Sequence, residues 1–307
     1  MFKEGASMYD LIIVGCGPAG MSAALYAGRA NKSVLILDGK SYGGQIINAS
    51  LVENYPGIDN ISGFDFATNL FNQIKKLGIE IKFERVIQVK RNEVITDNNN
   101  YSTKSIILAT GCSYRKIGIK DEDKYLGKGL SYCATCDGNF YRDKVVAVIG
   151  GGNTALEDAI YLSNIAKCVY LIHRRDIFRG EDKYLEYIKS LSNVELILNS
   201  QLLEIIGNDV ITGIKVKNND GSIKLLDIDG LFIAIGQVPN SQCFSKNIEI
   251  DKDGYIISSD GVHTNIDGIY VAGDVRVKDL RQLTTAISDG AISATVAIKE
   301  MEDIYGK

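Results

Sequence analysis

Two cysteines separated by two residues, Cys133 and Cys136, have the spacing in this chain that is most suggestive of chemistry. Such a pair can close a small disulfide ring, or it can supply thiolates to a metal ion. A zinc site would need two further ligands, but the remaining cysteines and both histidines stand singly along the sequence. The sequence therefore predicts no metal site and leaves a redox disulfide or an incidental close pair. Asp137, beside Cys136, is either an acid for a thiol or an ordinary turn residue.

Two glycine-rich segments flank the cysteine pair and favour the redox interpretation. The first lies between a short apolar run at residues 11–14 and an alanine-rich helix predicted at residues 21–29. Its GxGxxG spacing lets a pyrophosphate approach the backbone, and the helix N-terminus offers free N–H groups. A second apolar run ends on Asp38, from which a carboxylate can bind an adenosine ribose. The residues of this predicted dinucleotide site are Gly15, Gly17, Pro18, Ala19, Gly20 and Asp38.

The second glycine-rich segment repeats this design between an apolar run at residues 145–149 and a helix predicted to end at Ser163. Its paired strand, at residues 169–172, ends on a histidine and arginines instead of an acid. Arginines attract a ribose 2′-phosphate, which an acid would repel, so this site is predicted to take NADP(H) and not NAD. A solvated basic turn is the alternative. The residues of this second site are Gly150, Gly152, Asn153, Thr154, Ala155, His173, Arg174, Arg175 and Arg179.

Three further segments have a less specific pattern. Apolar runs at residues 105–109 and 269–272 precede Gly111 and the pair Gly273 and Asp274. Strand ends of this kind line the ligand crevice of an open α/β sheet, so Asp274 is a candidate for binding a cofactor hydroxyl, although a turn would look similar. Alternating apolar residues on both sides of residues 218–221 predict a β-hairpin.

Composition indicates an ordinary soluble enzyme. The chain has 307 residues, enough for two domains, with 45% hydrophobic and 23% charged residues. Lys and Arg number 34 against 38 Asp and Glu, and the net charge of −4 argues against a nucleic-acid or anionic-membrane partner. The first apolar run is too short for a signal peptide or a membrane-spanning helix. We therefore expect a cytoplasmic protein.

In combination, these motifs resemble those of the low-molecular-weight, bacterial-type NADPH-dependent thioredoxin reductases, over nearly the whole chain. The motifs that carry the resemblance are Gly15-Cys16-Gly17-Pro18-Ala19-Gly20, Gly43-Gly44-Gln45, Glu53-Asn54-Tyr55-Pro56-Gly57, Ala109-Thr110-Gly111, Cys133-Ala134-Thr135-Cys136-Asp137-Gly138, residues 150–155, His173-Arg174-Arg175 with Arg179, Gly273-Asp274 and Arg281-Gln282.

The resemblance implies an α/β fold with two Rossmann-like, three-layer dinucleotide-binding domains, the second inserted in the first. Residues 1–114 and 246–307 would form a discontinuous FAD-binding domain, and residues 115–245 an NADPH-binding domain that carries the redox disulfide. It also implies a homodimer and oxidised thioredoxin as the protein substrate. The FAD-site residues added by the resemblance are Gly43, Gly44, Gln45, Asn54, Thr110, Gly111, Gly273, Asp274, Arg281, Gln282 and Leu283.

The resemblance also assigns roles to the redox residues. Electrons would pass from NADPH through FAD to the Cys133–Cys136 disulfide, with Cys136 facing the flavin and Cys133 attacking the disulfide of the partner. Asp137 would act as the proton donor. Leu283, where the family usually has alanine, and Cys112, where a small residue is usual, depart from the pattern.

The sequence disfavours five alternatives to this interpretation. A ferredoxin-dependent flavin thioredoxin reductase would lack the second glycine loop and its arginines, and a ferredoxin–NADP reductase would lack the cysteine pair. The reductase subunit of a peroxidase system would carry an additional N-terminal module. A non-enzymatic flavin-binding redox sensor would need neither an NADP site nor an exposed disulfide. Larger disulfide reductases have a further domain with an acid-base histidine, which the length of this chain does not accommodate.

Overall fold

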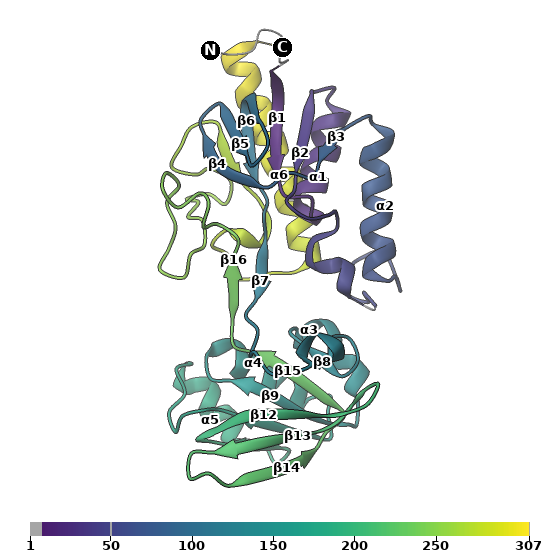
Figure 1. Cartoon of the computed structure of the whole chain (residues 1–307), viewed down its shortest axis with the longest axis vertical. Coiled ribbons are helices and arrows are strands. Elements are labelled where there is room, and N and C mark those ends of the chain that lie inside the picture. Colours follow the sequence, from purple (N-terminus) through teal and green to yellow (C-terminus); the bar gives the residue numbers. More distant parts are fainter. Residues whose placement is uncertain (1–7, 50, 307) are drawn as a thin grey trace. The chain divides into compact units, whose positions relative to one another are not determined.

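The structure, a computed structural model, describes residues 8–49 and 51–306. The chain divides into two compact units (Figure 1). Unit 1 takes residues up to 113 and from 238 onward, and unit 2 takes residues 114–237. The second unit is thus inserted in the first. The sequence placed the crossings between the two domains near residues 114 and 245.

Unit 1 is built on a sheet with the order β3-β2-β1-β6-β5-β4, in which β17 also pairs with β6. β1, β2, β3, β6 and β17 run parallel, whereas β4 and β5 are antiparallel additions. Residues 11–14 of β1 and all of β2 are buried, as expected for parallel strands covered on both faces. The strands are β1 (Tyr9–Val14), β2 (Val34–Leu37), β3 (Glu80–Lys82), β4 (Val86–Lys90), β5 (Glu93–Thr96), β6 (Asn100–Leu108) and β17 (Ile269–Val271).

The helices of unit 1 pack mainly on one face of this sheet. The core on that face joins Ile13 and Ile36 of the sheet to Ala23 of α1, Ile74 of α2 and Ala297 of α6. The helical elements are α1 (Pro18–Arg29), η1 (Gly44–Asn48), α2 (Gly63–Lys76), η4 (Gly273–Val275) and α6 (Leu283–Tyr305).

Unit 2 repeats the arrangement with a parallel sheet in the order β11-β10-β9-β15-β8. An antiparallel sheet, β12-β13-β14, covers one of its faces, and helices cover the other (Figure 1). The predicted hairpin is confirmed, because β13 and β14 pair antiparallel across the turn at residues 219–222. The strands are β8 (Leu130–Ser131), β9 (Val145–Gly150), β10 (Cys168–Ile172), β11 (Val194–Ile197), β12 (Ser200–Gly207), β13 (Ile211–Asn218), β14 (Ile223–Asp227) and β15 (Gly230–Ala234). The helical elements are η2 (Glu122–Tyr125), α3 (Ala134–Asp137), η3 (Gly138–Tyr141), α4 (Asn153–Ser163) and α5 (Asp182–Ser190).

The chain passes from one unit to the other at β7 (Cys112–Tyr114) and β16 (Gln237–Pro239), which pair with each other. Unit 2 ends at Gln237 because the residues that follow are bonded to unit 1. The Asn240 side chain donates a hydrogen bond to the Thr110 carbonyl oxygen at 2.9 Å, and its backbone N–H donates to Gly111 O at 2.9 Å. The Thr110 hydroxyl donates to Asn240 O at 2.7 Å.

Candidate functional site

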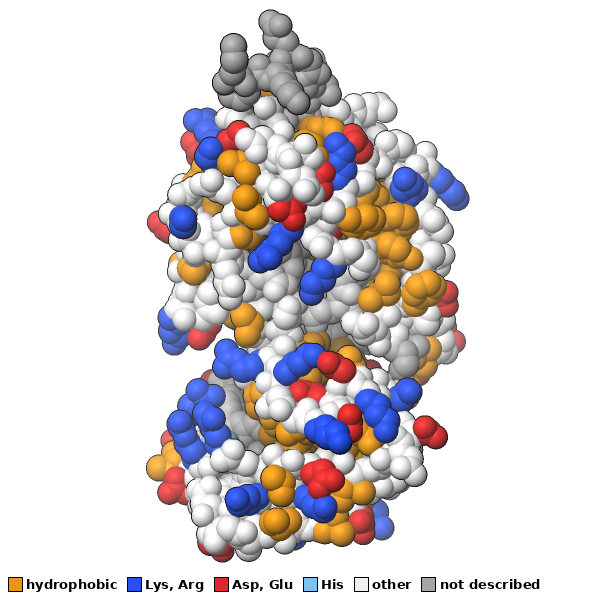
Figure 2. Space-filling view, viewed as in Figure 1, with side chains coloured by type: hydrophobic (Ala, Val, Ile, Leu, Met, Phe, Trp, Pro, Cys, Tyr) orange, Lys and Arg blue, Asp and Glu red, His pale blue; other side chains and the backbone are white. Residues whose placement is uncertain are grey.

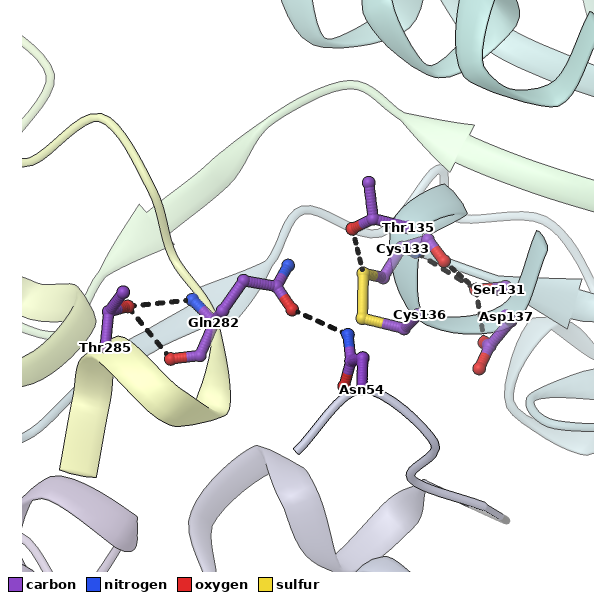
Figure 3. Close-up of a disulfide and its surroundings, with 8 residues drawn as sticks. All are labelled: Asn54, Ser131, Cys133, Thr135, Cys136, Asp137, Gln282 and Thr285. Carbon is purple, nitrogen blue, oxygen red and sulfur yellow. Dashed lines mark hydrogen bonds between the residues drawn. A yellow bond between two sulfur atoms is a disulfide. The ribbon is translucent and has the colours of Figure 1, made fainter. Parts of the chain in front are cut away.

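A disulfide joins Cys133 and Cys136 in unit 2, with 5.3 Å between their Cα atoms (Figure 3). The pairing expected from the CxxC spacing is therefore present. Cys133 precedes α3 as its N-cap residue, and both cysteines are half-buried. The Thr135 hydroxyl lies 3.4 Å from Cys133 Sγ. The ring is thus held on a single short helical turn, where its sulfurs are neither sealed in the core nor fully exposed.

Asp137 follows the disulfide ring and is held by Ser131, which ends β8. The Ser131 hydroxyl donates to Asp137 Oδ2 at 2.6 Å, and the Cys133 N–H donates to the same hydroxyl oxygen at 3.0 Å. Burial raises the pKa of Asp137, and the hydrogen bond from Ser131 offsets part of that rise. A carboxyl group with a raised pKa can hold a proton nearer to neutral pH, which suits a proton donor.

The predicted dinucleotide residues of unit 1 come together at one edge of its sheet. β1, β2, β6 and β17 are parallel, and the register aligns Val14 with Leu37 and Leu108, and Leu108 with Val271. The residues after these four strand ends therefore lie along the same edge. They are Gly15, Asp38, Ala109, Thr110, Gly273 and Asp274.

Each glycine of the first loop is favoured for a different physical reason. Gly15 has φ +114°, and a Cβ there would lie 2.3 Å from Ala109 O, while a Cβ at Gly20 would lie 1.9 Å from Gly15 O. A Cβ at Gly17 meets nothing nearer than 3.8 Å, so the backbone faces open space at that position. The helix begins at Pro18, earlier than the predicted residue 21, because proline is favoured in the first helical turn.

Asp38 and Gln45 are both oriented by backbone groups. Asp38 Oδ2 accepts the Cys16 N–H at 2.8 Å, and Oδ1 accepts the Lys40 N–H at 2.9 Å. The Gln45 side-chain amide donates to Cys112 O. Gln45 follows the predicted pair Gly43 and Gly44, whose φ angles of 101° and 60° favour glycine.

Asp274 carries a buried oxygen, Oδ1, that has no hydrogen-bond partner among the described residues. Burial also raises the pKa of this carboxyl group. The Lys278 ammonium lies 3.8 Å from this oxygen, too far for a hydrogen bond. Because a buried acceptor without a hydrogen bond is costly, Oδ1 is suited to accept from a hydroxyl or N–H group. Arg281 lies close by in the fold, since its Nε donates to Asp274 O at 3.4 Å and its guanidinium stacks on Tyr255 at 4.0 Å.

Asn54 and Gln282, also predicted site residues, bond to each other. Asn54 Nδ2 donates to Gln282 Oε1 at 3.1 Å (Figure 3). Gln282 is the N-cap of α6, and its backbone N–H donates to the Thr285 hydroxyl at 3.1 Å. Leu283 is therefore the first helical residue of α6. The family usually has alanine at this position, and the leucine of this chain leaves the capping interactions of Gln282 intact.

In unit 2, the second glycine loop lies at the carboxyl edge of β9, beside the end of β10. A Cβ at Gly150 would lie 2.6 Å from Ala155 Cβ. Small residues at both positions therefore allow β9 and α4 to pack closely, as in the dinucleotide-binding motif. Nothing lies within 4 Å of the Cβ position at Gly152. Thr154, in the first turn of α4, is exposed. The Asn153 carbonyl oxygen Oδ1 accepts the Glu181 N–H at 2.8 Å, which ties the loop to the start of α5.

His173 lies beneath this loop and is buried. A Cβ at Gly151 would lie 2.1 Å from the His173 ring, which stacks on Phe178 with 4.9 Å between ring centroids. Its Nε2 lies 3.1 Å from Ile177 O. Burial lowers the pKa of His173. The structure therefore places this residue as a support for the loop rather than at its open surface.

Arg174, Arg175 and Arg179, by contrast, are exposed. None of the three forms an ion pair with any residue that the structure describes. The Arg179 N–H donates to Gly151 O at 2.7 Å, which brings the arginine segment onto the glycine loop. Three guanidinium groups without acidic partners beside an open glycine loop are suited to binding a phosphate.

Comparison with known proteins agrees with this geometry. The pyridine nucleotide-disulphide oxidoreductase family matches residues 9–290. The thioredoxin reductase of Mycoplasma genitalium is 40% identical over 97% of this chain and 96% of its own length. The crystal structure of thioredoxin reductase from Streptococcus pyogenes has a TM-score of 0.93 at 40% identity, covering 97% of this chain and 100% of that one. The chain belongs to the thioredoxin reductase family.

A relative with a different name matches at a similar level. The glucosaminate ammonia-lyase of Pseudomonas fluorescens is 41% identical over 92% of this chain and 93% of its own length. Identity alone therefore does not separate a thioredoxin reductase from this relative. The Cys133–Cys136 disulfide and the acid beside it are the features of this chain that favour the reductase chemistry.

Sequence reasoning did not identify three buried polar residues around these sites. Ser131 holds Asp137, and a serine two residues before a CxxC motif was the available signal. Glu122 accepts the N–H groups of Ile117 and Gly118 at 3.0 and 2.9 Å. Asp289 of α6 accepts the Gly273 N–H at 3.0 Å and bonds to basic side chains near the Asp274 loop. Nothing local in the sequence indicates the last two contacts.

Proposed function

We propose that this protein is an NADPH-dependent thioredoxin-disulfide reductase that binds FAD in unit 1 and NADPH in unit 2. The observation that carries the proposal is the Cys133–Cys136 disulfide on the same unit as a dinucleotide loop whose arginines form no ion pair with the described residues. The two related thioredoxin reductases support it because each match covers 97% of the chain. A flavin bound in unit 1 would accept a hydride from the nicotinamide and deliver two electrons to the disulfide.

The residues of unit 1 fit FAD. The α1 N-terminus has no side-chain cap, so its N–H groups are available to a pyrophosphate beside the open Gly17. Asp38, fixed at the end of β2, retains acceptor capacity for a ribose hydroxyl. The buried Oδ1 of Asp274 suits a hydroxyl donor such as that of a ribityl chain. We propose that these residues hold FAD, together with the predicted contacts from Gln45, Asn54 and the start of α6.

The residues of unit 2 fit NADPH better than NADH. Gly152 offers the open backbone for the pyrophosphate, and α4 begins there without a side-chain cap. Arg174, Arg175 and Arg179 would hold the 2′-phosphate by charge-assisted hydrogen bonds. A ferredoxin-dependent reductase has no need for these arginines. Their presence, without an acidic partner in the part of the chain that the structure describes, favours NADPH over that alternative.

The cysteine chemistry follows from thiol–disulfide exchange. In the reduced form, the Cys133 thiolate attacks the partner disulfide, which forms a mixed disulfide and releases one thiolate of the partner. The Cys136 thiolate then attacks Cys133 Sγ, so that the ring disulfide forms again and the second partner thiolate leaves. We propose that Asp137 supplies a proton to a thiolate in this sequence, because burial keeps its carboxyl group protonated to a higher pH than usual.

We further propose that the protein acts as a cytoplasmic homodimer with contacts through unit 1. Large hydrophobic side chains are exposed there, including Tyr26 of α1 and Phe64 of α2, at 50% and 53% exposure. Figure 2 shows hydrophobic side chains gathered over the α1 and α2 side of this unit. Among the described residues, no helix is both long and apolar enough to cross a membrane. Light scattering of the purified protein tests the dimer.

One assay set tests the proposed activity. The purified protein should oxidise NADPH only when oxidised thioredoxin is present, and a variant with both Cys133 and Cys136 changed to serine should not. NADH and reduced ferredoxin serve as alternative donors. Ammonia release from glucosaminate tests the activity named for the Pseudomonas relative. Thioredoxin-independent NADPH oxidation, or ammonia release without disulfide reduction, would contradict the proposal.

A further inference from the structure

Ser131 links the redox helix to the strand before it. It ends β8, which pairs in parallel with β15 through Leu130–Leu231 and Ser131–Phe232. Its side chain is almost fully buried, at 3% exposure. The strand therefore fixes the hydroxyl in place, and the hydroxyl is in contact with both ends of α3: the backbone of Cys133 and the carboxyl group of Asp137 (Figure 3).

The hydrogen bonds of this hydroxyl can be assigned by counting protons. Ser131 Oγ accepts the Cys133 N–H at 3.0 Å, so part of its acceptor capacity is used. Its single proton has two acceptors within reach, Asp137 Oδ2 at 2.6 Å and Cys133 O at 3.3 Å. The shorter bond to a carboxyl oxygen is the stronger one. Ser131 is therefore a donor to Asp137 Oδ2.

This assignment distinguishes the two oxygens of Asp137. Oδ2 accepts a hydrogen bond from the Ser131 hydroxyl. Among the described residues, this is the side-chain hydrogen bond of the Asp137 carboxyl group. A proton on Oδ2 would compete with that bond, whereas a proton on Oδ1 leaves it in place. The bond persists in both protonation states of the acid and is stronger in the ionised one.

We propose that Ser131 is a positioning residue for proton transfer, which holds Asp137 through Oδ2 and leaves Oδ1 as the oxygen that carries the transferable proton. The inference rests on the proposed role of Asp137 as the acid. In the transfer step, the O–H bond at Oδ1 breaks and an S–H bond forms on the thiolate. Asp137 becomes a carboxylate that still accepts from Ser131, and no electrons are exchanged.

The test compares four variants of the holoenzyme: Ser131→Ala, Ser131→Thr, Asp137→Asn and Ser200→Ala. Ser200 is the matched control because it is equally buried, at 3% exposure, and its hydroxyl donates to Leu198 O in another part of unit 2. The measurements are the pH profile of kcat/KM for thioredoxin, the rate of flavin reduction by NADPH, and an infrared titration of the Asp137 carboxyl band. The Asp137→Asn variant identifies that band.

Loss of the donor should raise the pKa of Asp137, because the carboxylate loses its hydrogen bond. We expect Ser131→Ala to lower kcat/KM about tenfold and to move the alkaline limb and the infrared titration up by roughly one pH unit. Flavin reduction by NADPH should stay unchanged. Ser131→Thr keeps the hydroxyl and should retain the wild-type titration, as should Ser200→Ala.

Two outcomes separate failure of this inference from failure of the proposed acid. If Asp137→Asn loses thioredoxin turnover but Ser131→Ala titrates like Ser200→Ala, Ser131 does not position the acid and the inference is wrong. If Asp137→Asn keeps the wild-type rate and pH profile, Asp137 is not the acid, and that part of the proposed function is wrong. If Ser131→Ala folds poorly, Ser131→Thr provides the test instead. A tenfold loss of kcat/KM for thioredoxin in Ser131→Thr, with no shift in the infrared titration of Asp137, would also overturn the inference.

Discussion

Gly290 of α6 lies against the backbone of Ala19 in α1, so closely that a Cβ at Gly290 would be 2.1 Å from Ala19 O. The close approach joins two distant segments of the chain. α1 starts in the first glycine loop, and α6 starts at the Gln282 cap. The Ser22 hydroxyl also donates to Ile287 O at 2.7 Å across the same helix pair. The contact therefore sets how the two predicted parts of the FAD site meet.

The first prediction is that Gly290→Ala destabilises the protein and weakens FAD binding. Backbone atoms of Ala19 cannot move aside as a flexible side chain could, so the extra methyl group must separate the helices. We expect a loss of about 3 kcal/mol in the free energy of unfolding, at the upper end for overpacked cores. The measurements are urea unfolding and the flavin content of the purified protein. Thr295→Ala, on the exposed side of α6, is the control and should retain both.

The Gly290–Ala19 contact also illustrates which features the sequence could predict. The two glycine loops and the cysteine pair are local patterns, whose glycine and thiol spacings have direct physical reasons. The structure has the predicted strands before both loops, the hairpin and the disulfide. The sequence predicts the start of the first helix at residue 21, whereas the structure starts it at Pro18, because proline is favoured in the first helical turn.

Long-range pairing could not be read from the sequence in the same way. The bonds of Ser131 to Asp137 and of Asp289 to Gly273 depend on which elements pack together. Neither contact has a periodic signature. The burial of His173 could not be predicted from the sequence either. Its position next to the arginines predicts a contact with the nucleotide, whereas the fold buries its ring under Gly151.

The second prediction concerns the choice of nucleotide. Changing Arg174 and Arg175 together to alanine should raise the KM for NADPH about 100-fold or more, because each charge-assisted hydrogen bond contributes about 1.5–3 kcal/mol where well made and about 1.4 kcal/mol corresponds to a factor of ten. Use of NADH should be almost unchanged, since it has no 2′-phosphate. The control changes Lys167 and Lys217, which are exposed elsewhere in unit 2, and removes the same charge. Equal losses with both nucleotides would indicate a structural role for the arginines.

The third prediction divides the work between the two redox cysteines. In Cys136→Ser, the remaining Cys133 thiolate should attack a single-cysteine thioredoxin that carries its attacking cysteine as a mixed disulfide with thionitrobenzoate. The thionitrobenzoate thiolate leaves, and a stable disulfide between Cys133 and thioredoxin remains. In Cys133→Ser, no such adduct should accumulate. The resemblance to thioredoxin reductases motivates this order, because Cys133 would attack the partner and Cys136 would face the flavin.

This trapping experiment needs a background without competing thiols. Cys243 is the exposed free cysteine among the described residues, so both variants should also carry Cys243→Ser. Non-reducing gels and mass spectrometry locate the adduct. An adduct on Cys136 and none on Cys133 would reverse the assignment but leave the overall activity intact.

The last prediction is a pH dependence of stability that comes from His263 in unit 1. Its Nδ1 lies 2.6 Å from Asp260 Oδ2, and its Nε2 lies 2.7 Å from Glu300 Oε1 on α6. Glu300 also accepts the Tyr270 hydroxyl at 2.7 Å. The hydrogen bond to Asp260 is the main cause that raises the pKa of His263, and the bond to Glu300 raises it further. Partial burial of the ring offsets part of this rise. The imidazolium thus joins the loop at residues 260–263 to the C-terminal half of α6.

The sign of the effect follows from the raised pKa of His263. The stabilisation is fully present below the pKa of the unfolded state, about 6.5, and is lost as the pH rises through the higher pKa of the folded state. The melting temperature of the wild type should therefore exceed that of His263→Gln at pH 6, and the difference should shrink towards pH 9. Lys90→Gln, which removes an exposed cation paired with Glu93 at 2.8 Å, is the control, because lysine stays charged over this range. A wild-type advantage over His263→Gln that is the same at pH 6 and pH 9 would show that the imidazole acts through packing and not through its charge.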